Sequence, residues 1–290
     1  MANSKKNKSE EPAKQHFVPK VYLKNFCNAS GKLQVYDTKT KRILSNMSPA
    51  EVALQSHLYT LEVEKAKKDY CVEKYLGELE SEYGAVLTRL EANASTTLSV
   101  KDIPSVLRFI AFLYARNPTQ LSRYSEIASG VLSFMAESML AYNLREQNES
   151  HLRTSFEVTV SPTYIQTATM KTMFAIADKI FTDMANSGHW FFLRSRSGME
   201  FITTDVPAAN MVMVPLSKKL LLMRTTEDIE IVKKFNNVID VPPQKVARFN
   251  GHIAVTAKRW VYASTCEMLT QAIRHIDSHL VNTPDLPRLP

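Results

Sequence analysis

The chain has 290 residues, of which 44% are hydrophobic and 22% are charged, a balance that is ordinary for a globular protein in water. Its net charge of +7 permits binding to a polyanion but does not require it. Its three cysteines lie far apart and form no C-x-x-C pair, which argues against a disulfide framework or a thiolate zinc site and predicts a cytoplasmic location. The longest apolar run, Phe109–Ala115, is too short to cross a bilayer, so no membrane association is expected.

The N-terminal part predicts a disordered leader followed by short elements. Residues 1–15 form a basic, polar leader without a packed apolar pattern. Pro19 is placed as the first residue of a short helix, where its missing N–H is not needed. Period-two alternation and turn residues predict the other elements, namely a β-hairpin at 33–37 and 42–44, a short helix from Ser48 to Glu51 with a capping box, and a strand at 57–61.

The middle of the chain has helical periodicity. Apolar residues recur at three and four positions in four segments, which predict helices at 69–92, 101–116, 120–142 and 163–185. The segment 120–142 is apolar on most sides, so we expect it to be buried among the other helices. Residues 143–160 are polar and predict a loop.

After Gly188 the period returns to two. The predicted elements are paired strands at 189–193 and 200–204, a strand at 220–223, a helix at 243–257, a strand at 260–263, a helix at 267–276 and a loose proline-rich tail at 281–290. Strands from both the N- and C-terminal parts therefore flank a central helical bundle. This order predicts an α+β fold with short antiparallel hairpins or a small sheet, in one domain over residues 16–280.

No strong catalytic signature is present, because the chain lacks the phosphate-loop, dinucleotide, nucleophile-elbow and zinc-protease motifs. Three polar residues could carry chemistry or serve structure. His16 could be a general base, a metal ligand or a helix cap. Arg116 could cap helix carbonyls or grip a phosphate. Asp205, at the end of an apolar strand, could be an active-site carboxylate or an Asx-turn residue.

Two further patterns leave alternatives open. Glu73 and Glu80 lie two helical turns apart, so they could hold a divalent cation or form a solvated face. Lys245, Arg248 and His252 recur at three and four positions, so they could follow a phosphate backbone or face solvent.

Ordered motifs over about residues 16–264 resemble the bacterial family called domain of unknown function 4238. The resemblance rests on His16–Pro19 with Leu23–Phe26, on Leu33–Asp37, His57–Thr60, Glu73, Glu80, Ala115–Pro118, Phe201–Pro207 and Pro215–Ser217, and on Asn250, Arg259, Tyr262 and Ala263. Val206 departs from the family pattern, which more often has a polar residue there. The resemblance marks six polar motif positions, which are His16, Asn25, Arg116, Asp205, Asn250 and Arg259.

These residues would suit phosphodiester chemistry around one cleft. The first hypothesis is a nucleic-acid-processing, nuclease-like hydrolase in a defence or toxin setting, with a divalent metal as the candidate cofactor. In it His16 and Asp205 are catalytic, and the binding residues are Asn25, Arg116, Asn250 and Arg259. The alternative is a non-catalytic sensor or binding module for a partner protein or nucleic acid, in which the same residues form a buried structural network.

Overall fold

The computed structural model describes residues 14–63, 67–92, 102–147, 158–187, 189–196, 198–225 and 238–277. Most of the predicted leader and all of the predicted tail lie outside these residues. The described chain begins with a strand at Lys14–His16, so Lys14 and Gln15 belong to the folded body and not to the leader. Gln15 is buried, and its side-chain amide donates to the hydroxyl of Thr60 and the carboxylate of Glu73.

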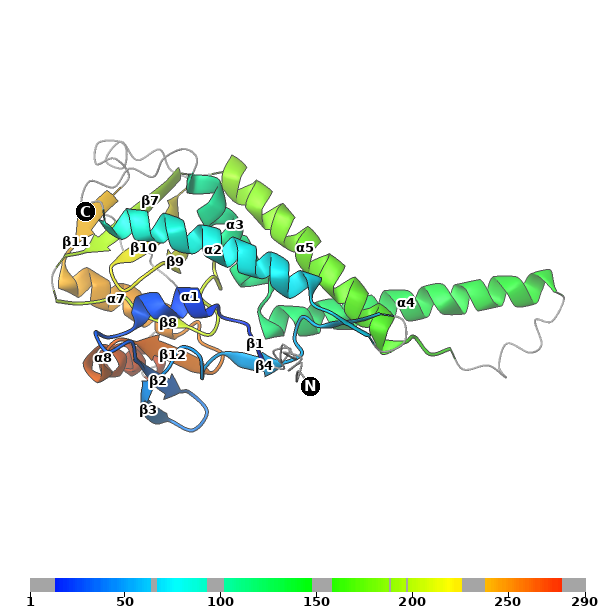
Figure 1. The fold of residues 1–290 in the computed structure, drawn as a ribbon, viewed down its shortest axis with the longest axis horizontal. Coiled ribbons are helices and arrows are strands. Elements are labelled where there is room, and N and C mark those ends of the chain that lie inside the picture. The colour runs from blue at the N-terminus through cyan, green and yellow to red at the C-terminus, as the bar shows by residue number, and fades with distance from the viewer. Residues whose placement is uncertain are drawn as a thin grey trace, which may run out of the picture.

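Helices and small sheets together form an α+β fold, as predicted (Figure 1). The helices are α1 Lys20–Leu23 and the 3-10 turn η1 Lys24–Phe26, α2 Cys71–Ala92, α3 Asp102–Ala115, α4 Pro118–Glu146, α5 Pro162–Asn186, α7 Pro243–Ala254 and α8 Cys266–Asp277. The strands are β1 Lys14–His16, β2 Leu33–Asp37, β3 Arg42–Met47, β4 Leu54–Ser56, β5 Leu61–Val63, β6 Lys67–Asp69, β7 His189–Ser195, β8 Thr203–Thr204, β9 Met213–Pro215, β10 Leu220–Thr225, β11 Val238–Val241 and β12 Trp260–Ala263. Within these residues, no helix combines the length and apolarity that a membrane span requires.

Two four-stranded sheets join distant parts of the chain. One has the order β3-β2-β12-β8, so the predicted N-terminal hairpin pairs with a C-terminal strand. The other has the order β11-β7-β10-β9. The predicted pairing of segment 200–204 with β7 is wrong, because β7 pairs with β10 while β8 pairs with β12. The run from Leu220 to Met223 is apolar on both faces and therefore suits the buried interior of that sheet better than a segment ending in two threonines.

Two local predictions in the N-terminal part are wrong. The predicted helix at Ser48–Glu51 is a turn, although Glu51 still accepts a hydrogen bond from the Ser48 N–H at 2.8 Å. Ala53 has φ of 54°, a left-handed conformation that cannot continue a helix. The predicted strand at 57–61 is also displaced, because β4 ends at Ser56 and His57, with φ of 50°, turns the chain away.

The core connects the sheets with the helices. Tyr22 lies at its centre and donates to the Pro215 carbonyl at 2.6 Å, which ties α1 to β9. Tyr83 of α2 and Phe109 of α3 stack with ring centroids 3.8 Å apart. A second apolar cluster lies between the sheets and the helices α7 and α8, and a third lies among α2, α3, α4 and α5. Residues far apart in sequence therefore stabilise one another.

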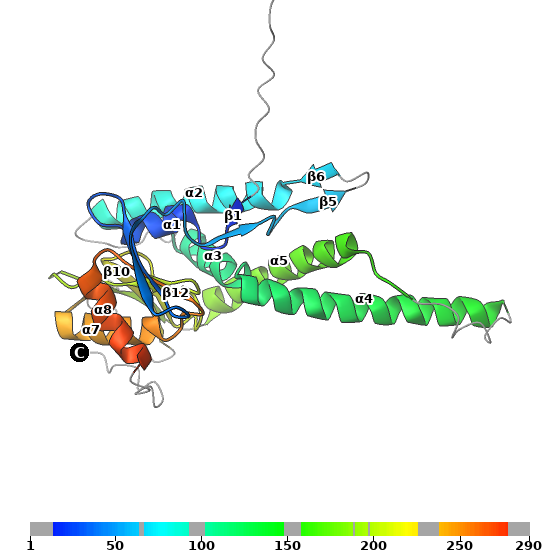
Figure 2. The ribbon, with the colours of Figure 1, turned by 90° about the horizontal axis from the view of Figure 1, so that it is seen from below.

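Helix α4 is only partly covered by the body. Asn117 caps it by accepting from the Thr119 N–H at 3.0 Å, and Leu121 and Tyr124 pack in the third cluster with Met170 of α5. Beyond this point α4 projects away from the body (Figures 1 and 2). The prediction that the whole segment 120–142 is buried among helices is therefore wrong for its second half. Residues 127–146 of α4 are called the arm below.

Candidate functional site

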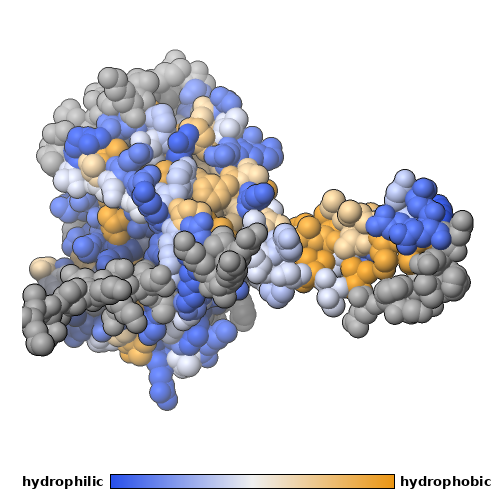
Figure 3. Space-filling model, turned by 45° about the vertical axis from the view of Figure 1, so that its right-hand side comes forward, coloured by the Kyte–Doolittle hydropathy of each residue, from blue (hydrophilic) through white to orange (hydrophobic). Residues whose placement is uncertain are grey.

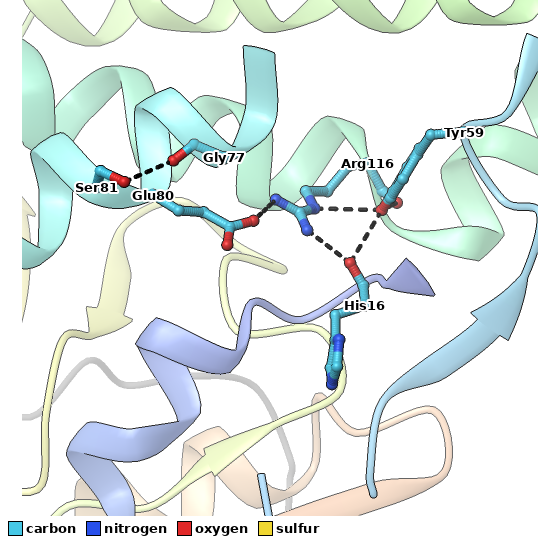
Figure 4. A network of polar contacts seen from close by, with 6 residues as sticks. All are labelled: His16, Tyr59, Gly77, Glu80, Ser81 and Arg116. Atoms are coloured by element: carbon cyan, nitrogen blue, oxygen red, sulfur yellow. Dashed lines mark hydrogen bonds and ion pairs between the residues drawn. The ribbon is translucent and has the colours of Figure 1, made fainter. Parts of the chain in front are cut away.

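Arg116 is the centre of a buried polar network at the end of α3 (Figure 4). Its side chain is 4% exposed and donates to Glu80 at 2.8 Å, to the Tyr59 hydroxyl at 3.2 Å and to the His16 carbonyl at 2.6 Å. Burial opposes the charge of the guanidinium, but Tyr59 and Glu80 together raise the pKa of Arg116 above its usual value. Arg116 thus links α3, α2 and β1, and all three nitrogen atoms of its guanidinium have partners in the fold.

His16 joins this network through its backbone and not through its ring. The imidazole points away from Arg116, and its Nε2 lies 3.1 Å from the Pro49 carbonyl oxygen (Figure 4). Burial lowers the pKa of His16 below 6.5, and the nearby cations Lys20 and Arg116 act in the same direction. The ring is therefore neutral at neutral pH and oriented toward a backbone carbonyl.

Asp205 braces the connection between α7 and β12. It is 5% exposed, and its two carboxylate oxygens accept from the backbone N–H groups of Lys258 at 2.9 Å and Arg259 at 2.8 Å. Its own carbonyl accepts from the Asn117 amide at 2.9 Å. Burial raises the pKa of Asp205, and the backbone hydrogen bonds oppose that rise. The carboxylate holds a turn in place, as an acceptor for two N–H groups that have no strand or helix partner.

The two asparagines marked by the family resemblance also bond to backbone. Asn25 donates to the carbonyls of Val21 and Tyr22 at 2.9 and 3.1 Å, which closes the short helix α1. Asn250 of α7 accepts from the Ile202 N–H at 3.1 Å and donates to the Glu200 carbonyl at 2.8 Å. Its side-chain amide thus makes the two hydrogen bonds that the backbone of a neighbouring strand would make.

Arg259 is the most exposed of the six motif residues, with 45% of its side chain accessible. It donates to Asp37 at 3.1 Å and lies 4.3 Å from the centre of the Trp260 ring. Burial raises the pKa of Asp37, but Arg259 and the N–H groups of Lys39 and Thr40 outweigh this and lower it overall. This pair joins β2 to the turn that Asp205 holds.

The six residues therefore fall into separate neighbourhoods. Arg116 meets the backbone of His16, and Asp205 meets the backbone of Arg259, while Asn25 and Asn250 lie in their own contacts. Two participants were not singled out as site residues. Tyr59, the third residue of the motif His57–Thr60, supplies its hydroxyl to Arg116, and Asn117 joins the end of α3 to Asp205. The signal for Tyr59 in the sequence is its place in the motif His57–Thr60, because its contact with Arg116, 57 residues away, is seen only in the fold.

A cavity of about 420 Å³ lies beside Asn117. Its polar lining includes Tyr114, Asn117, Thr119, Asn210, Thr256 and Lys258, and none of the lining residues that the structure describes is acidic. Neither His16, Arg116 nor Asp205 lines it, although Asp205 braces its wall through Asn117 and Lys258. None of the six polar motif positions therefore lines this cavity, and only Asp205 supports its wall through bonded neighbours.

The described residues offer little for metal binding or for a basic nucleic-acid face. Glu73 and Glu80 accept from different donors, Gln15 and Arg116, and no group of three or more potential metal ligands occurs among the described residues. On the predicted basic face of α7, Lys245 and His252 are half-buried and Arg248 is exposed, and all three residues have interactions within the fold.

The arm has a continuous apolar face. Its large exposed side chains, each between 53% and 71% accessible, are Ile127, Val131, Phe134, Met135, Met139 and Tyr142. Figure 3 shows apolar residues gathered along this projection. The same helical face is buried closer to the body, at Tyr124 and Ala128. These six side chains are called the stripe below.

Residues 14–267 match the family described as a protein of unknown function, DUF4238. The chain belongs to this family. The match covers every motif that carried the resemblance, from His16 to Ala263, and so confirms it. No curated protein and no solved structure matches the chain.

Proposed function

We propose that this protein is a non-catalytic binding module that binds a partner protein through the arm. The observation that carries the proposal is the stripe, in which six large apolar side chains are more than half exposed on one face of a projecting helix. Contiguous exposed apolar patches on folded proteins are typical of interaction sites. Aromatic and methionine side chains also supply much of the binding energy in protein interfaces.

The energetics of the arm support the same proposal. Most helical stability in proteins comes from packing of an apolar face, and on the arm this face is exposed. The only charged residue between positions 127 and 144 is Glu137, so charged side chains do little to solvate this stretch. A partner that covers the stripe would therefore stabilise the arm while it binds.

The motif network supports a binding role over hydrolysis. A catalytic group must reach the substrate, within hydrogen-bond distance of the reacting proton. The carboxylate of Asp205 and the guanidinium of Arg116 are instead buried and bonded within the fold, and the ring of His16 is directed at Pro49. These contacts fit the network of the alternative hypothesis, in which the motif residues stabilise the frame.

Site-specific photocrosslinking in cells tests the proposal. A photoreactive phenylalanine analogue is placed at Phe134, and at Glu137 as the matched control, because both side chains are exposed on the arm but only Phe134 belongs to the stripe. We expect a protein adduct at position 134 that mass spectrometry identifies, that is weak or missing at position 137, and that disappears with Val131→Asp. Equal adducts at both positions, or none at 134, would contradict the proposal.

A nuclease assay tests the competing hypothesis. The purified chain is incubated with single- and double-stranded RNA and DNA, with and without Mg²⁺ or Mn²⁺. We expect no cleavage above that of a matched preparation. Cleavage that disappears in His16→Ala, while this variant keeps the melting temperature of the wild type, would replace binding by catalysis as the assigned role.

A further inference from the structure

We infer that the partner of the arm is a second copy of this chain, and that two arms pair antiparallel about a two-fold axis near residues 134 and 135. The inference rests on the proposed function, because it names the occupant of the same stripe. It follows from the spacing of the stripe, from its charge, from its area and from the position of the body.

The spacing of the stripe is nearly the same when it is read in reverse. An axis between positions 134 and 135 places Ile127 opposite Tyr142 of a second copy, and Phe134 opposite Met135. Val131 then falls within one position of Met139. Steps of three and four residues are the seam along which two helices interlock their side chains. Every member of the stripe thus meets another member, which is the self-complementarity that a two-fold interface requires.

Charge does not oppose this pairing. Glu137 is exposed, and at 100° per residue it lies on the side of the helix away from the middle of the stripe. The pairing therefore buries no carboxylate and brings no like charges together at its centre. Met135 and Met139, whose side chains are unbranched, can adjust to the facing side chains.

The area suffices for a specific dimer. Six large side chains that are each more than half exposed offer on the order of 700 Å² per copy, close to the roughly 800 Å² per partner of a standard interface.

The body also favours the antiparallel arrangement. It joins the arm at the N-terminal end of α4, so antiparallel arms place the two bodies at opposite ends (Figures 1 and 2). Parallel arms would force the bodies side by side.

Measurement of mass in solution is the first test. The full chain is studied by light scattering and sedimentation over a range of concentrations. We expect a dimer, and we expect Met135→Glu to weaken it by roughly 100-fold, because a two-fold axis makes the change act twice and places two carboxylates together. Glu137→Lys is the control on the same arm and should leave the dimer intact. A cooperative melting transition in both variants would show that they are folded, because loss of the dimer alone can lower the melting temperature. A monomer at all concentrations, or equal effects of the two variants, would overturn the inference.

Engineered cysteines give the orientation. The two exposed cysteines, Cys71 and Cys266, are first replaced by serine. Oxidation should then cross-link Met135→Cys to itself, whereas Ile127→Cys should form no dimer alone, because its two copies lie on the order of 20 Å apart. Mixing Ile127→Cys with Tyr142→Cys should restore the cross-link. Efficient cross-linking of Ile127→Cys alone would indicate parallel arms and would overturn the antiparallel arrangement.

The two proposals fail in different ways. A monomer in solution with a Phe134 adduct that contains another protein would sustain the proposed function and reject the second copy. A monomer with no Phe134 adduct would reject both. A dimer that Met135→Glu disrupts, with a Phe134 adduct to the same chain, supports both.

Discussion

Replacing Arg116 by methionine should destabilise the protein more than any loss of a surface ion pair. The guanidinium has three partners in the fold, and methionine keeps much of the apolar stem while it removes all of these contacts. The His16 carbonyl loses a donor, and Glu80 loses the cation that neutralises it. Removing one partner of a buried pair typically costs about 3–5 kcal/mol, and we expect the lower end because Glu80 is 24% exposed and can regain some hydration. For a chain of this size that is a fall in Tm of roughly 10 °C.

Arg89→Met provides the matched control for this prediction. Arg89 also pairs with a carboxylate, that of Asp102, and it also links α2 to α3, but its side chain is 54% exposed. A solvent-exposed pair contributes only about 0–1 kcal/mol, so its Tm should change by about 2 °C or less. Both variants and the wild type are compared by differential scanning calorimetry in one buffer. If Arg116→Met and Arg89→Met have the same Tm, the network around Arg116 does not stabilise the fold as argued.

Three other predictions concern single residues. Asp205→Ala leaves the N–H groups of Lys258 and Arg259 without their acceptor, so we expect a loss of about 2–4 kcal/mol in urea unfolding, and no measurable loss would contradict the bracing role. The lowered pKa of His16 means that the folded state binds protons less readily than the unfolded state, so the wild type should lose stability as the pH falls below 6.5, and His16→Gln should show a smaller loss between pH 7.5 and 5.5. The lowered pKa of Asp37 stabilises the fold above 3.8, so the cost of Asp37→Asn in thermal unfolding should be full at pH 7 and should shrink as the pH falls below that value, and a cost that does not change with pH would refute the shift.

Local patterns were sufficient to predict most helices. The segments now seen as α2, α3, α5 and α7 each have a clear apolar period, and α4 begins where Asn117 and Pro118 provide a cap and a first residue. The predictions from sequence were wrong where the backbone conformation of one residue determines the direction of the chain. At Ala53 and His57 a positive φ redirects the chain. Alanine rarely adopts this conformation, and histidine, although enriched in it, adopts it in only a small fraction of cases.

The pairing of strands and the burial of helix faces could not be predicted from local sequence patterns, because both depend on the packing of the whole chain. Segment 200–204 and β10 both contain apolar residues at strand spacing, and although β10 is the more apolar of the two, its pairing with β7 is seen only in the packed fold. The apolar pattern of α4 correctly predicted a helix but not its exposure. The periodicity of a sequence shows that one face of a helix is apolar, but it does not show which part of the protein covers that face. The segment predicted to be a buried helix therefore forms the exposed arm.

The contrast between the motif residues and the stripe has a chemical cause. Asn250 must accept from one backbone N–H and donate to one carbonyl, and Asp205 must accept from two N–H groups, so very few side chains can replace either. The fold therefore requires polar side chains at these positions, and without knowledge of the fold such residues resemble a catalytic motif. The stripe demands only apolar side chains at steps of three and four, which many sequences satisfy. A surface built that way forms no recognisable motif. In this chain the polar motif residues bond within the fold, and the proposed binding surface becomes visible only when the exposure of α4 is known.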